Sequence, residues 1–446
     1  MLLLFIALFA QAFFRQGLAA WSTGLVYIFY DTCLLGFTAW QTRRLGRPDV
    51  LPTPHKLPSI GVIIAAHNEE RALSVTIDAL IAQHVIPDQI LIADDGSDDG
   101  TANVLAALYQ LQCPEIGMVS APSPILPRLR WLRLPHGGKA RALNAAIQHI
   151  DTEIILTVDA DTLLETHAIA AMRAYFGAEE KLVAATGVLT PVCGQSLSGR
   201  FFQWFQTYEY VRNFNSRYAW MQLNGLLLIS GAFAAFRRDA LLAVGGFDPD
   251  CLVEDYELIH RLHRHSTEHN MGWTVRVIGA ARARTDAPET LMTFLRQRRR
   301  WFAGFLQTQR WNRDMTGNRR FGWLGIAMMP VKAIDTLQPI YGLTAFGLLI
   351  GFVAAGRYAL AFPILLVMIA KVIVDLIFHL WSLRLYRNWT GDMQSAGSPK
   401  AILAAVFEPF SFQLMRHAGA AWGWWTFLTG QQSWGRQSRA GISAQV

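Results

Sequence analysis

The sequence predicts an α/β domain with a mostly parallel sheet, placed between apolar segments that enter a membrane. Hydrophobic residues make up 52% and charged residues 16% of the 446 positions, which is too apolar for an ordinary soluble domain. Between residues 59 and 310, short apolar runs alternate with helical stretches, as in sheets whose strands are joined by helices. Longer apolar segments lie on both sides, and the length leaves room for about two or three domains.

The N-terminal region, residues 1–45, is expected to be a membrane anchor. Residues 17–40 are long and apolar enough to cross the hydrocarbon core, whereas residues 1–14 alone are too short. Three arginines between positions 43 and 47 follow, and such residues mark the cytoplasmic ends of membrane helices. Residues 1–14 also lack a basic start, which favours an anchor over a removed signal peptide.

The predicted α/β domain covers residues 55–310 and follows a linker with three prolines between positions 51 and 58. Apolar runs typical of buried strands lie at residues 60–65, 89–93, 131–134, 154–158 and 182–185. Helical patterns lie at residues 70–83, 101–111 and 139–149. Open sheets of this kind bind ligands beyond the carboxyl ends of their strands. Acidic side chains are expected at that edge, because Asp94 and Asp95 end one predicted strand and Asp159 and Asp161 another.

After Arg320 the chain becomes apolar again, which predicts C-terminal membrane helices over residues 321–430. Residues 340–355 and 358–381 are expected to form a membrane hairpin that turns at Gly356. Residues 401–428 are a third candidate that either spans the membrane or lies in its interface, because charged and histidine side chains interrupt it. The last residues, 431–446, follow as a tail.

Charge and cysteine usage exclude two classes of protein. The net charge is +7, but the arginines gather beside apolar segments and no base-reading motif accompanies them, so we expect no nucleic-acid partner. The four cysteines are scattered without metal-binding spacing, which predicts neither a zinc site nor a disulfide framework and fits a reducing compartment.

Asp159 and Asp161 are the candidate metal ligands. Two carboxylates two residues apart at a strand end can project to one side. Hard oxygen ligands of this kind suit Mg²⁺ or Mn²⁺, with phosphate oxygens of a substrate completing the coordination. The alternative is a solvated acidic loop.

Two further loops carry groups suited to a nucleotide. A carboxylate of Asp94 or Asp95, in the turn that Gly96 permits, can accept hydrogen bonds from a ribose or a base edge, although a plain turn has the same composition. Lys139 opens a predicted helix after two glycines and can partner a diphosphate. A capping glycine pair with a surface lysine is the alternative there.

The remaining candidates lie near helix starts and on one helix face. Glu254 and Asp255 open a helix, where they either complement the helix dipole or accept a proton from an attacking hydroxyl. Gln297, Arg300 and Trp301 share a face, from which Arg300 can hold a diphosphate and Trp301 can stack on a sugar. The alternative is an amphipathic helix lying on the membrane, with its arginines on lipid phosphates.

Two other groups of residues are not expected to be sites. Four histidines between positions 260 and 269 resemble a zinc spacing, but they lack matching cysteine or carboxylate ligands. Lys371 and Asp375 lie four residues apart in an apolar segment, where mutual neutralisation on one helix face is the expected role.

Taken in order, these signatures resemble those of the membrane-embedded family 2 glycosyltransferases. More narrowly they resemble the processive synthases of cellulose, chitin, hyaluronan and poly-N-acetylglucosamine, over residues 59–310 closely and over the flanks in layout. The resemblance implies a GT-A, Rossmann-like catalytic domain flanked by transmembrane and interfacial helices. It also implies Asp255 as general base, and Asp159 and Asp161 as ligands of Mg²⁺ or Mn²⁺.

The resemblance further implies two sets of binding residues. Those expected to bind the nucleotide sugar are Asn68, Glu69, Asp94, Asp95, Lys139 and Arg300. Those expected to bind the acceptor are Ser230, Gly231, Glu254, Gln297 and Trp301. The chain departs from the family at His67, where a tyrosine is common, and at Val253, where a threonine is usual. The tail at residues 431–446 resembles a cytosolic gating segment.

The implied function is inverting, metal-dependent transfer of a sugar, glucose or N-acetylglucosamine, from a UDP-sugar to a growing β-linked polysaccharide, coupled to membrane translocation. Two alternatives stay open, namely transfer of a single sugar to a membrane lipid and an inactive membrane subunit of a polysaccharide export complex. The expected partners are the UDP-sugar donor, a glycan or lipid-linked acceptor, membrane lipid, and auxiliary membrane or periplasmic subunits. The expected location is the inner cell membrane, crossed several times, with the catalytic domain in the cytoplasm.

Overall fold

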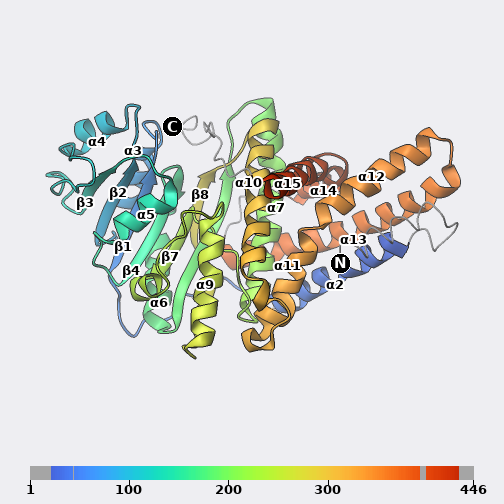
Figure 1. Cartoon of the computed structure of the whole chain (residues 1–446), viewed down its shortest axis with the longest axis horizontal. Coiled ribbons are helices and arrows are strands. Elements are labelled where there is room, and N and C mark those ends of the chain that lie inside the picture. The colour runs from blue at the N-terminus through green and yellow to red at the C-terminus, as the bar shows by residue number, and fades with distance from the viewer. Residues whose placement is uncertain (1–21, 44, 392–397, 431–446) are drawn as a thin grey trace.

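The computed structural model describes residues 22–43, 45–391 and 398–430. The expectations for residues 1–14 and for the tail at residues 431–446 lie outside these ranges. Figure 1 shows a sheet with its covering helices at one end of the molecule and a group of long helices at the other.

One half of the sheet is parallel and matches the sequence-based expectation. Its strands, in spatial order, are β3 (Leu129–Leu134), β2 (Gln89–Asp95), β1 (Ile60–Ala66) and β4 (Ile154–Asp159). Strand β1 pairs in parallel with β2 on one side and β4 on the other. Strands β1, β2 and β4 are almost entirely buried, as expected where helices cover both faces of a parallel sheet, whereas the edge strand β3 is partly exposed. All four were predicted from their apolar runs.

The other half of the sheet is mixed, so the expectation of a mostly parallel sheet is correct for only part of it. Continuing from β4, the order is β7 (Phe233–Arg237), β6 (Leu182–Val192), β8 (Thr274–Asp286) and β5 (Thr162–Leu164). Strand β7 runs antiparallel to β4 and β6, whereas β6 and β8 are parallel. Only β6 was predicted, since β5 and β7 are short and β8 carries arginines among its apolar residues.

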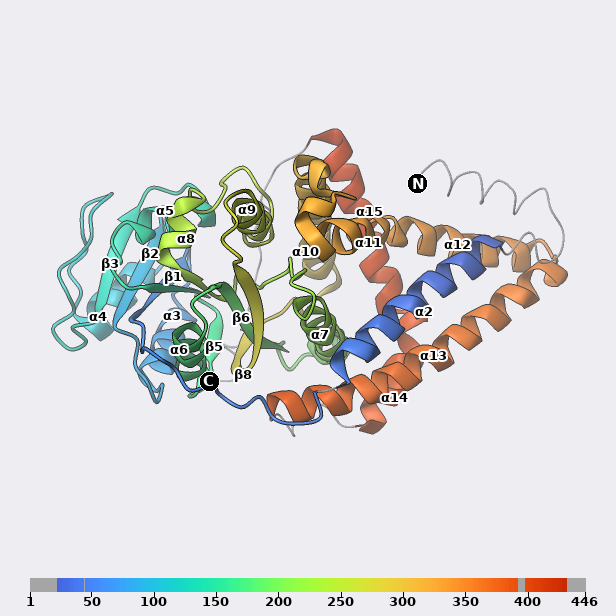
Figure 2. The ribbon, with the colours of Figure 1, turned by 90° about the horizontal axis from the view of Figure 1, so that it is seen from below.

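Helices cover both faces of the sheet. In Figure 2, α5 (Lys139–Ile147) and α8 (Arg238–Ala243) lie on one face, and α3 (Leu73–Ile81) and α6 (Ala168–Ala178) lie on the other. The remaining helices of this domain are α4 (Thr101–Tyr109) and α9 (Glu254–Glu268). The predicted helices at residues 70–83, 101–111 and 139–149 are confirmed, each with shorter bounds.

Two long helices, α7 (Leu197–Met221) and α10 (Leu291–Trp311), stand between the sheet and the outer helices (Figure 2). Two apolar residues of the stripe predicted for an amphipathic interface helix face other helices of the protein. Phe294 and Leu306 are buried, because α15 (Phe412–Thr429) packs along α10.

The outer helices include the predicted hairpin. Helix α12 (Gln338–Ala354) and helix α13 (Tyr358–Thr390) are joined by a turn in which Gly356 has a φ of +66°, a conformation that glycine adopts readily. The third predicted segment is not one continuous helix. It is broken into α14 (Ser398–Phe407) and α15 by the short helix η5 (Glu408–Phe410).

The other outer elements are α2 (Ser22–Thr42), η2 (Arg313–Met315), η3 (Arg319–Phe321), η4 (Leu324–Met328) and α11 (Met329–Asp335). Among the described helices, a single stretch, Leu324–Ala354, is long and apolar enough to cross a membrane, with a mean hydropathy of 1.6. It comprises η4, α11 and α12, and the other expected crossings do not meet this criterion within the described ranges.

The expected pairing of Lys371 with Asp375 is confirmed and extends to a second helix. Lys371 lies in α13, donates to Asp375 one turn later, and also reaches Asp31 of α2 at 2.7 Å. The lysine therefore joins α2 to α13 as well as neutralising its own helix face.

Candidate active site

The candidate site lies at the carboxyl ends of β1, β2 and β4, which are neighbours in the parallel half of the sheet. Strand β2 ends at Asp95 and strand β4 ends at Asp159, while Asn68 and Glu69 follow the end of β1. The predicted acidic residues are therefore brought to one edge, as expected for an open sheet of this topology.

Asp95 holds the loop that precedes α5. Its carboxylate accepts hydrogen bonds from the backbone N–H of Gly137 at 2.7 Å and of Gly138 at 2.9 Å. The neighbouring Asp94 is 2% exposed and accepts from the backbone N–H of Ser97 and from the indole N–H of Trp131. Asp94 thus stabilises the turn and the sheet, which agrees with the alternative of a structural turn at that position.

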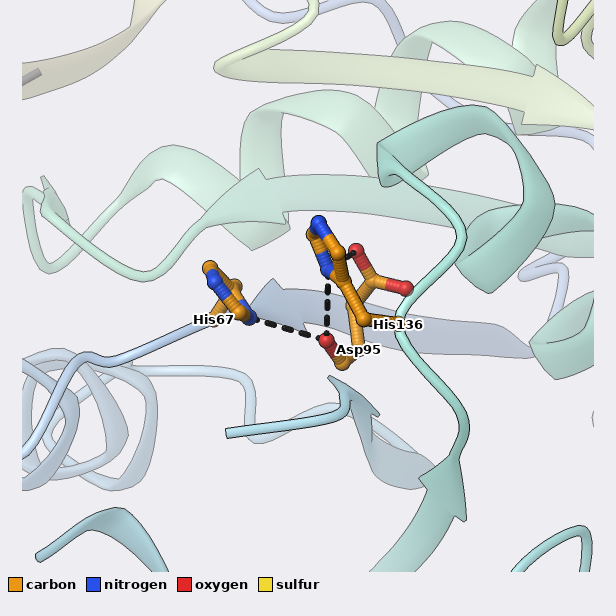
Figure 3. A group of neighbouring side chains, drawn as sticks. All are labelled: His67, Asp95 and His136. Atoms are coloured by element: carbon orange, nitrogen blue, oxygen red, sulfur yellow. Dashed lines mark hydrogen bonds and ion pairs between the residues drawn. The ribbon is translucent and has the colours of Figure 1, made fainter. Parts of the chain in front are cut away.

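His67 and His136 form a stacked pair above Asp95, with ring centroids 4.3 Å apart and an interplanar angle of 25° (Figure 3). Each Nδ1 lies within hydrogen-bond distance of the backbone carbonyl of Asp95, at 2.8 Å for His67 and 3.1 Å for His136. A carbonyl only accepts, so both Nδ1 atoms carry the proton. His136 also lies 3.0 Å from the Asp95 carboxylate.

Potential ligand atoms of His67, Asp95 and His136 lie within 4.8 Å of one another. The stacking argues against a metal centre in this arrangement. The lone pairs of nearly parallel imidazole rings do not converge on one point, and the Asp95 carboxylate already accepts two backbone hydrogen bonds. His136 was not among the predicted site residues, although its place beside the Gly137-Gly138 pair was a signal.

Asn68 and Glu69 connect the end of β1 to the loop that follows β2. Asn68 has a φ of +61°, and its side chain exchanges hydrogen bonds with Asp98, from Nδ2 to the carboxylate at 2.7 Å and from the Asp98 N–H at 2.9 Å. The backbone N–H of Glu69 donates to Thr101 at 3.0 Å. These predicted donor-binding residues therefore shape the rim of the strand edge.

Lys139 is the centre of a buried charge cluster. Its ammonium donates to Asp159 at 2.5 Å and to the carbonyl of Gly231 at 3.3 Å, and it lies 3.8 Å from the carboxylate of Glu254. Burial opposes the charged form, but Asp159, Glu254 and Asp255 together raise the pKa of Lys139 above its ordinary value. With a side chain 22% exposed, Lys139 is not the surface lysine of the alternative interpretation.

Asp255 is bound to the backbone opposite Lys139. Its carboxylate accepts from the N–H of Gly231 at 2.7 Å and from the N–H of Tyr256 at 2.8 Å. A Cβ atom at Gly231 would lie 2.9 Å from this carboxylate, so the close approach requires a glycine. Val253 is the N-cap of α9 and makes no side-chain capping bond, because its side chain has no hydroxyl of the kind that a threonine would offer there.

Glu254 is the neighbouring carboxylate of α9 that lies close to Lys139. It is 4% exposed, and burial raises its pKa, with Asp255 adding to the effect and Lys139 and Arg300 opposing it. Arg300 donates to the carbonyl of Leu252 at 3.1 Å, which fixes the guanidinium next to the start of α9.

The helix face predicted to hold Gln297, Arg300 and Trp301 contains a further residue that the sequence analysis missed. Arg298 is 4% exposed and makes two hydrogen bonds to Glu209 of α7, at 2.9 and 2.7 Å. Its guanidinium also lies 4.5 Å from the ring centroid of Trp301. The signal for this pair was Glu209 itself, which is an acid inside an aromatic run of α7.

A cavity of about 320 Å³ runs from Asp255 toward the outer helices. Ser230 and Asp255 line it on the sheet side, and Trp301 lines it from α10. Residues of α7, α11 and α15 are among those that form the other walls. The predicted general base and two of the five predicted acceptor-binding residues thus share one space, whereas Gly231, Glu254 and Gln297 are not part of its lining.

Asp159 and Asp161 fit a divalent cation by the chemistry of their donor atoms. Both offer carboxylate oxygens at the end of β4, which are the ligands that Mg²⁺ and Mn²⁺ prefer. One oxygen of Asp159 already accepts from Lys139, so a bound ion and the lysine would lie side by side. Asp161 is 2% exposed, which protects its carboxylate from bulk water.

Comparisons with known proteins bear on the class of reaction. The family model described as "Glycosyltransferase like family 2" matches residues 58–304. Similar curated proteins include a probable glycosyltransferase, YdaM, of Bacillus subtilis, 27% identical over 291 residues, which are 63% of each chain. Another is the poly-beta-1,6-N-acetyl-D-glucosamine synthase of Staphylococcus aureus, 27% identical over 285 residues, which are 64% of this chain and 61% of the synthase. The match spans less than two thirds of both relatives.

A solved structure, the mannosyltransferase PcManGT of Pyrobaculum calidifontis in complex with GDP-Man and Mn²⁺, superposes with a TM-score of 0.55. The alignment covers 91% of this chain and 98% of the other, at 19% sequence identity. At that identity the likeness shows a common fold.

Proposed function

Because this chain belongs to the family 2 glycosyltransferases, we propose that it transfers a sugar from a nucleotide-sugar donor to an acceptor hydroxyl at a membrane. In its full form the proposal is inverting transfer of glucose or N-acetylglucosamine from a UDP-sugar to a growing β-linked polysaccharide, with coupled translocation. The family assignment supports the reaction class, and the likeness to a poly-beta-1,6-N-acetyl-D-glucosamine synthase supports the polymeric product.

One observation carries the proposal. Asp255 lies between the strand edge proposed to bind the donor and the cavity proposed to bind the acceptor. Its carboxylate accepts from Gly231, whose carbonyl accepts from Lys139, and Lys139 in turn pairs with Asp159. The same carboxylate lines the cavity that contains Trp301. A base placed there reaches an acceptor hydroxyl on one side and a donor sugar on the other.

The donor side is built to stabilise the charge of a leaving nucleoside diphosphate. Lys139 at the strand edge and Arg300 beside the start of α9 supply fixed positive charge, which would stabilise the charge that a diphosphate gains during transfer. A Mg²⁺ or Mn²⁺ ion held by Asp159 and Asp161 would add Lewis-acid charge beside that diphosphate when bound. Asn68, Glu69 and Asp95 frame the part of the edge proposed for the nucleoside.

The acceptor side deprotonates the nucleophile and positions its ring. Asp255 takes the proton of the acceptor hydroxyl as the oxygen forms a bond to the anomeric carbon, and the bond to the diphosphate breaks on the opposite face. This in-line displacement inverts an α-linked donor to a β-linked product. Trp301 offers an aromatic face to the acceptor sugar, and Ser230 offers a hydroxyl at the base of the cavity.

The membrane part of the proposal rests on the outer helices. The stretch Leu324–Ala354 meets the length and hydropathy of a crossing, and the cavity is walled by residues that begin this stretch, such as Met328 and Lys332. We propose an anchor over residues 1–45, a GT-A domain over residues 55–310 and membrane helices over residues 321–430. The protein would then cross the inner membrane several times, with the catalytic domain in the cytoplasm and auxiliary subunits alongside.

A second candidate is transfer of a single sugar to a membrane lipid. The observation in its favour is that the same cavity is bounded by Met328 and Pro339, from the stretch most suited to contact lipid. The third candidate, an inactive subunit, is disfavoured because the residues proposed to act in transfer are all present, with Lys139 in contact with Asp159 and linked to Asp255 through the backbone of Gly231.

Transfer assays on the full-length protein in nanodiscs test the proposal. Radiolabelled UDP-sugars are offered one at a time with Mg²⁺ or Mn²⁺, and the size of any labelled product is measured. Polymer formed from one donor, and lost in Asp255→Asn, is the expected result. The exposed Asp250 on the preceding loop provides a matched control, Asp250→Asn. Label confined to a small lipid would establish the second candidate, and no transfer from any donor would refute both.

A further inference from the structure

The cavity beside Asp255 has four basic side chains in its wall. They are Arg217 of α7, Arg298 of α10, Lys332 of α11 and Arg416 of α15. Such a concentration of positive charge beside apolar and aromatic residues is unusual for a space that holds a neutral sugar chain, because buried cations need partners.

Three of the four have carboxylate partners. Arg298 and Arg416 share the carboxylate of Glu209, at 2.7 and 3.4 Å. Lys332 pairs with Asp335 at 3.2 Å. Glu209 carries one negative charge against two guanidinium groups, so its cluster has an excess of positive charge.

Arg217 is the exception among them. No carboxylate of the described residues lies within 4.0 Å of its guanidinium, and Nε and Nη1 are buried without any acceptor in that part of the chain. Its neighbour is the ring of Phe214, with the guanidinium carbon 4.5 Å from the ring centroid. Burial lowers the pKa of Arg217 to about 10, although Tyr210 and Asp255 act in the opposite direction.

Arg217 does not form an ion pair with Asp255. The Asp255 carboxylate accepts from the backbone N–H groups of Gly231 and Tyr256, and the two charged groups are not in contact. His417 is a second polar group without a partner in the same wall. It is 4% exposed, and both ring nitrogens are buried with no hydrogen-bond partner among the described residues.

We propose that Arg217 binds an anionic group of the acceptor, either a carboxylate or a phosphate, so that the acceptor of this enzyme is acidic. A planar guanidinium with unsatisfied donors is suited to these two groups, whose oxygens accept several hydrogen bonds at once. The acceptor is then either a glycan that contains uronic acids or a lipid that bears a phosphate. The inference rests on the proposed function, because it takes the cavity as the acceptor site.

Binding to the full-length protein in phosphatidylcholine nanodiscs, without donor, tests the inference apart from catalysis. Two matched pairs of probes are compared by calorimetry, a tetra-galacturonate with cellotetraose and decyl phosphate with decyl glucoside. We expect at least one acidic probe to bind about tenfold more tightly than its neutral match, the order of one charge-assisted contact. A preference confined to galacturonate assigns an acidic glycan, and one confined to decyl phosphate assigns a lipid phosphate.

Variants of Arg217 then locate the contact. Arg217→Gln should remove the preference for the acidic probe and leave binding of the neutral probe unchanged, while Arg217→Lys should keep part of it. Arg200→Gln is the control, since Arg200 is an exposed arginine on the same helix. Should Arg217→Gln fail to fold, the preference of the wild-type protein for acidic probes and its reduction in Arg217→Lys still test the inference.

Equal binding of acidic and neutral probes, or a preference that survives Arg217→Gln, would overturn the inference. Its failure is distinguishable from failure of the proposed function. Sugar transfer without a preference for acidic probes would refute the role of Arg217 alone. A preference without transfer from any donor would instead refute the proposed reaction.

Discussion

At the scale of residues, the candidate site is organised around one lysine among three carboxylates. Lys139 touches Asp159 and lies close to Glu254, while Asp255 adds its field from the other side of Gly231. The charged lysine offsets part of the negative charge of this cluster, and its raised pKa keeps it protonated. The same positive charge lies where a diphosphate would leave.

Lys139→Met should therefore lower the rate of transfer more than it lowers donor affinity. Removal of one preorganised electrostatic group lowers kcat by about 10²–10³-fold in comparable sites. Steady-state kinetics with each effective donor measure the changes in kcat and KM separately. Arg141, two residues later on the exposed side of α5, supplies the control Arg141→Met. An unchanged kcat in Lys139→Met would contradict the assignment of Lys139 to the leaving group.

The buried His260 makes stability depend on pH. Burial lowers the pKa of His260 to about 4, below the 6.5 of an exposed histidine, and its Nδ1 is directed at the carbonyl of Tyr256. Between pH 6.5 and pH 4 this histidine is protonated in the unfolded chain but not in the folded chain. Its contribution to the free energy of unfolding is therefore complete above pH 6.5 and is lost as the pH falls toward 4.

We expect this histidine to lower the free energy of unfolding by up to about 3 kcal/mol over this pH range, since each unit of pKa difference corresponds to about 1.4 kcal/mol. Thermal denaturation between pH 7 and pH 4 measures it, and His260→Gln should flatten the slope. His269→Gln, at an exposed histidine one residue beyond α9, should leave the slope unchanged. Identical slopes in wild type and His260→Gln would show that another group is responsible.

At the scale of elements, α10 is the structural link between the site and the outer helices. It carries Arg300 and Trp301 on one side and is held by α15 on another through two glycines, Gly419 and Gly423. Their lack of side chains lets the two backbones approach closely, a form of packing common among membrane helices. The position of Trp301 therefore depends on α15.

Gly423→Leu should push α15 away from α10. A Cβ atom at Gly423 would already lie 2.7 Å from the Cβ of Phe302 and 2.8 Å from the carbonyl oxygen of Arg299. We expect a loss of about 1–3 kcal/mol in stability, as for other overpacked positions. Thermal unfolding of the purified protein measures it. Gly347→Leu should be tolerated, because a Cβ atom at Gly347 would have no described atom within 4 Å.

The ion pair between Arg298 and Glu209 joins α10 to α7 in a buried setting. Among the described residues, Arg298→Met would leave the Glu209 carboxylate with only the more distant Arg416, at 3.4 Å. Breaking a buried pair in this way costs about 3–5 kcal/mol, whereas replacing both partners by apolar residues is often close to neutral.

We accordingly expect the double variant Arg298→Met with Glu209→Leu to be more stable than Arg298→Met alone, by thermal denaturation. The exposed Arg296 on the same helix gives the control Arg296→Met. A double variant less stable than the single one would mean that Glu209 is held chiefly by other contacts.

At the scale of the whole molecule, the sheet domain and the outer helices are joined at several points. Asp49, which follows α2, accepts from the backbone N–H of Gly279 at 2.9 Å and from the hydroxyl of Tyr175 at 2.5 Å. Lys371 joins α2 to α13 through Asp31. The cavity with Arg217 lies between these two parts, so its shape depends on both.

The proposed topology places the turn between α12 and α13 on the side of the membrane opposite the catalytic domain. A cysteine in that turn, Ala355→Cys in a Cys33→Ser background, should react with a membrane-impermeant maleimide in intact spheroplasts. The native Cys113 is exposed in the sheet domain and should react only after lysis. Labelling of both cysteines, or of neither, before lysis would refute the proposed arrangement.

The sequence by itself determined the parallel half of the sheet and the edge that carries the site. Strands β1, β2 and β4 are continuous apolar runs, and the carboxylates of Asp95 and Asp159 fall where those runs end. The local pattern of apolar residues is enough to predict these strands, because a strand that is buried on both faces consists of a continuous apolar run. The same holds for the hairpin of α12 and α13, whose turn is marked by Gly356.

Only the tertiary structure decided which charges are paired between segments remote in the chain. Glu209 and Arg298 are 89 positions apart, and Arg217 becomes distinctive only because no carboxylate of the described residues reaches it. The antiparallel strand β7 and the covering of α10 by α15 were likewise not predicted. The physical reason is that pairing and desolvation depend on distances between segments remote in the chain, which local patterns of hydrophobicity do not specify.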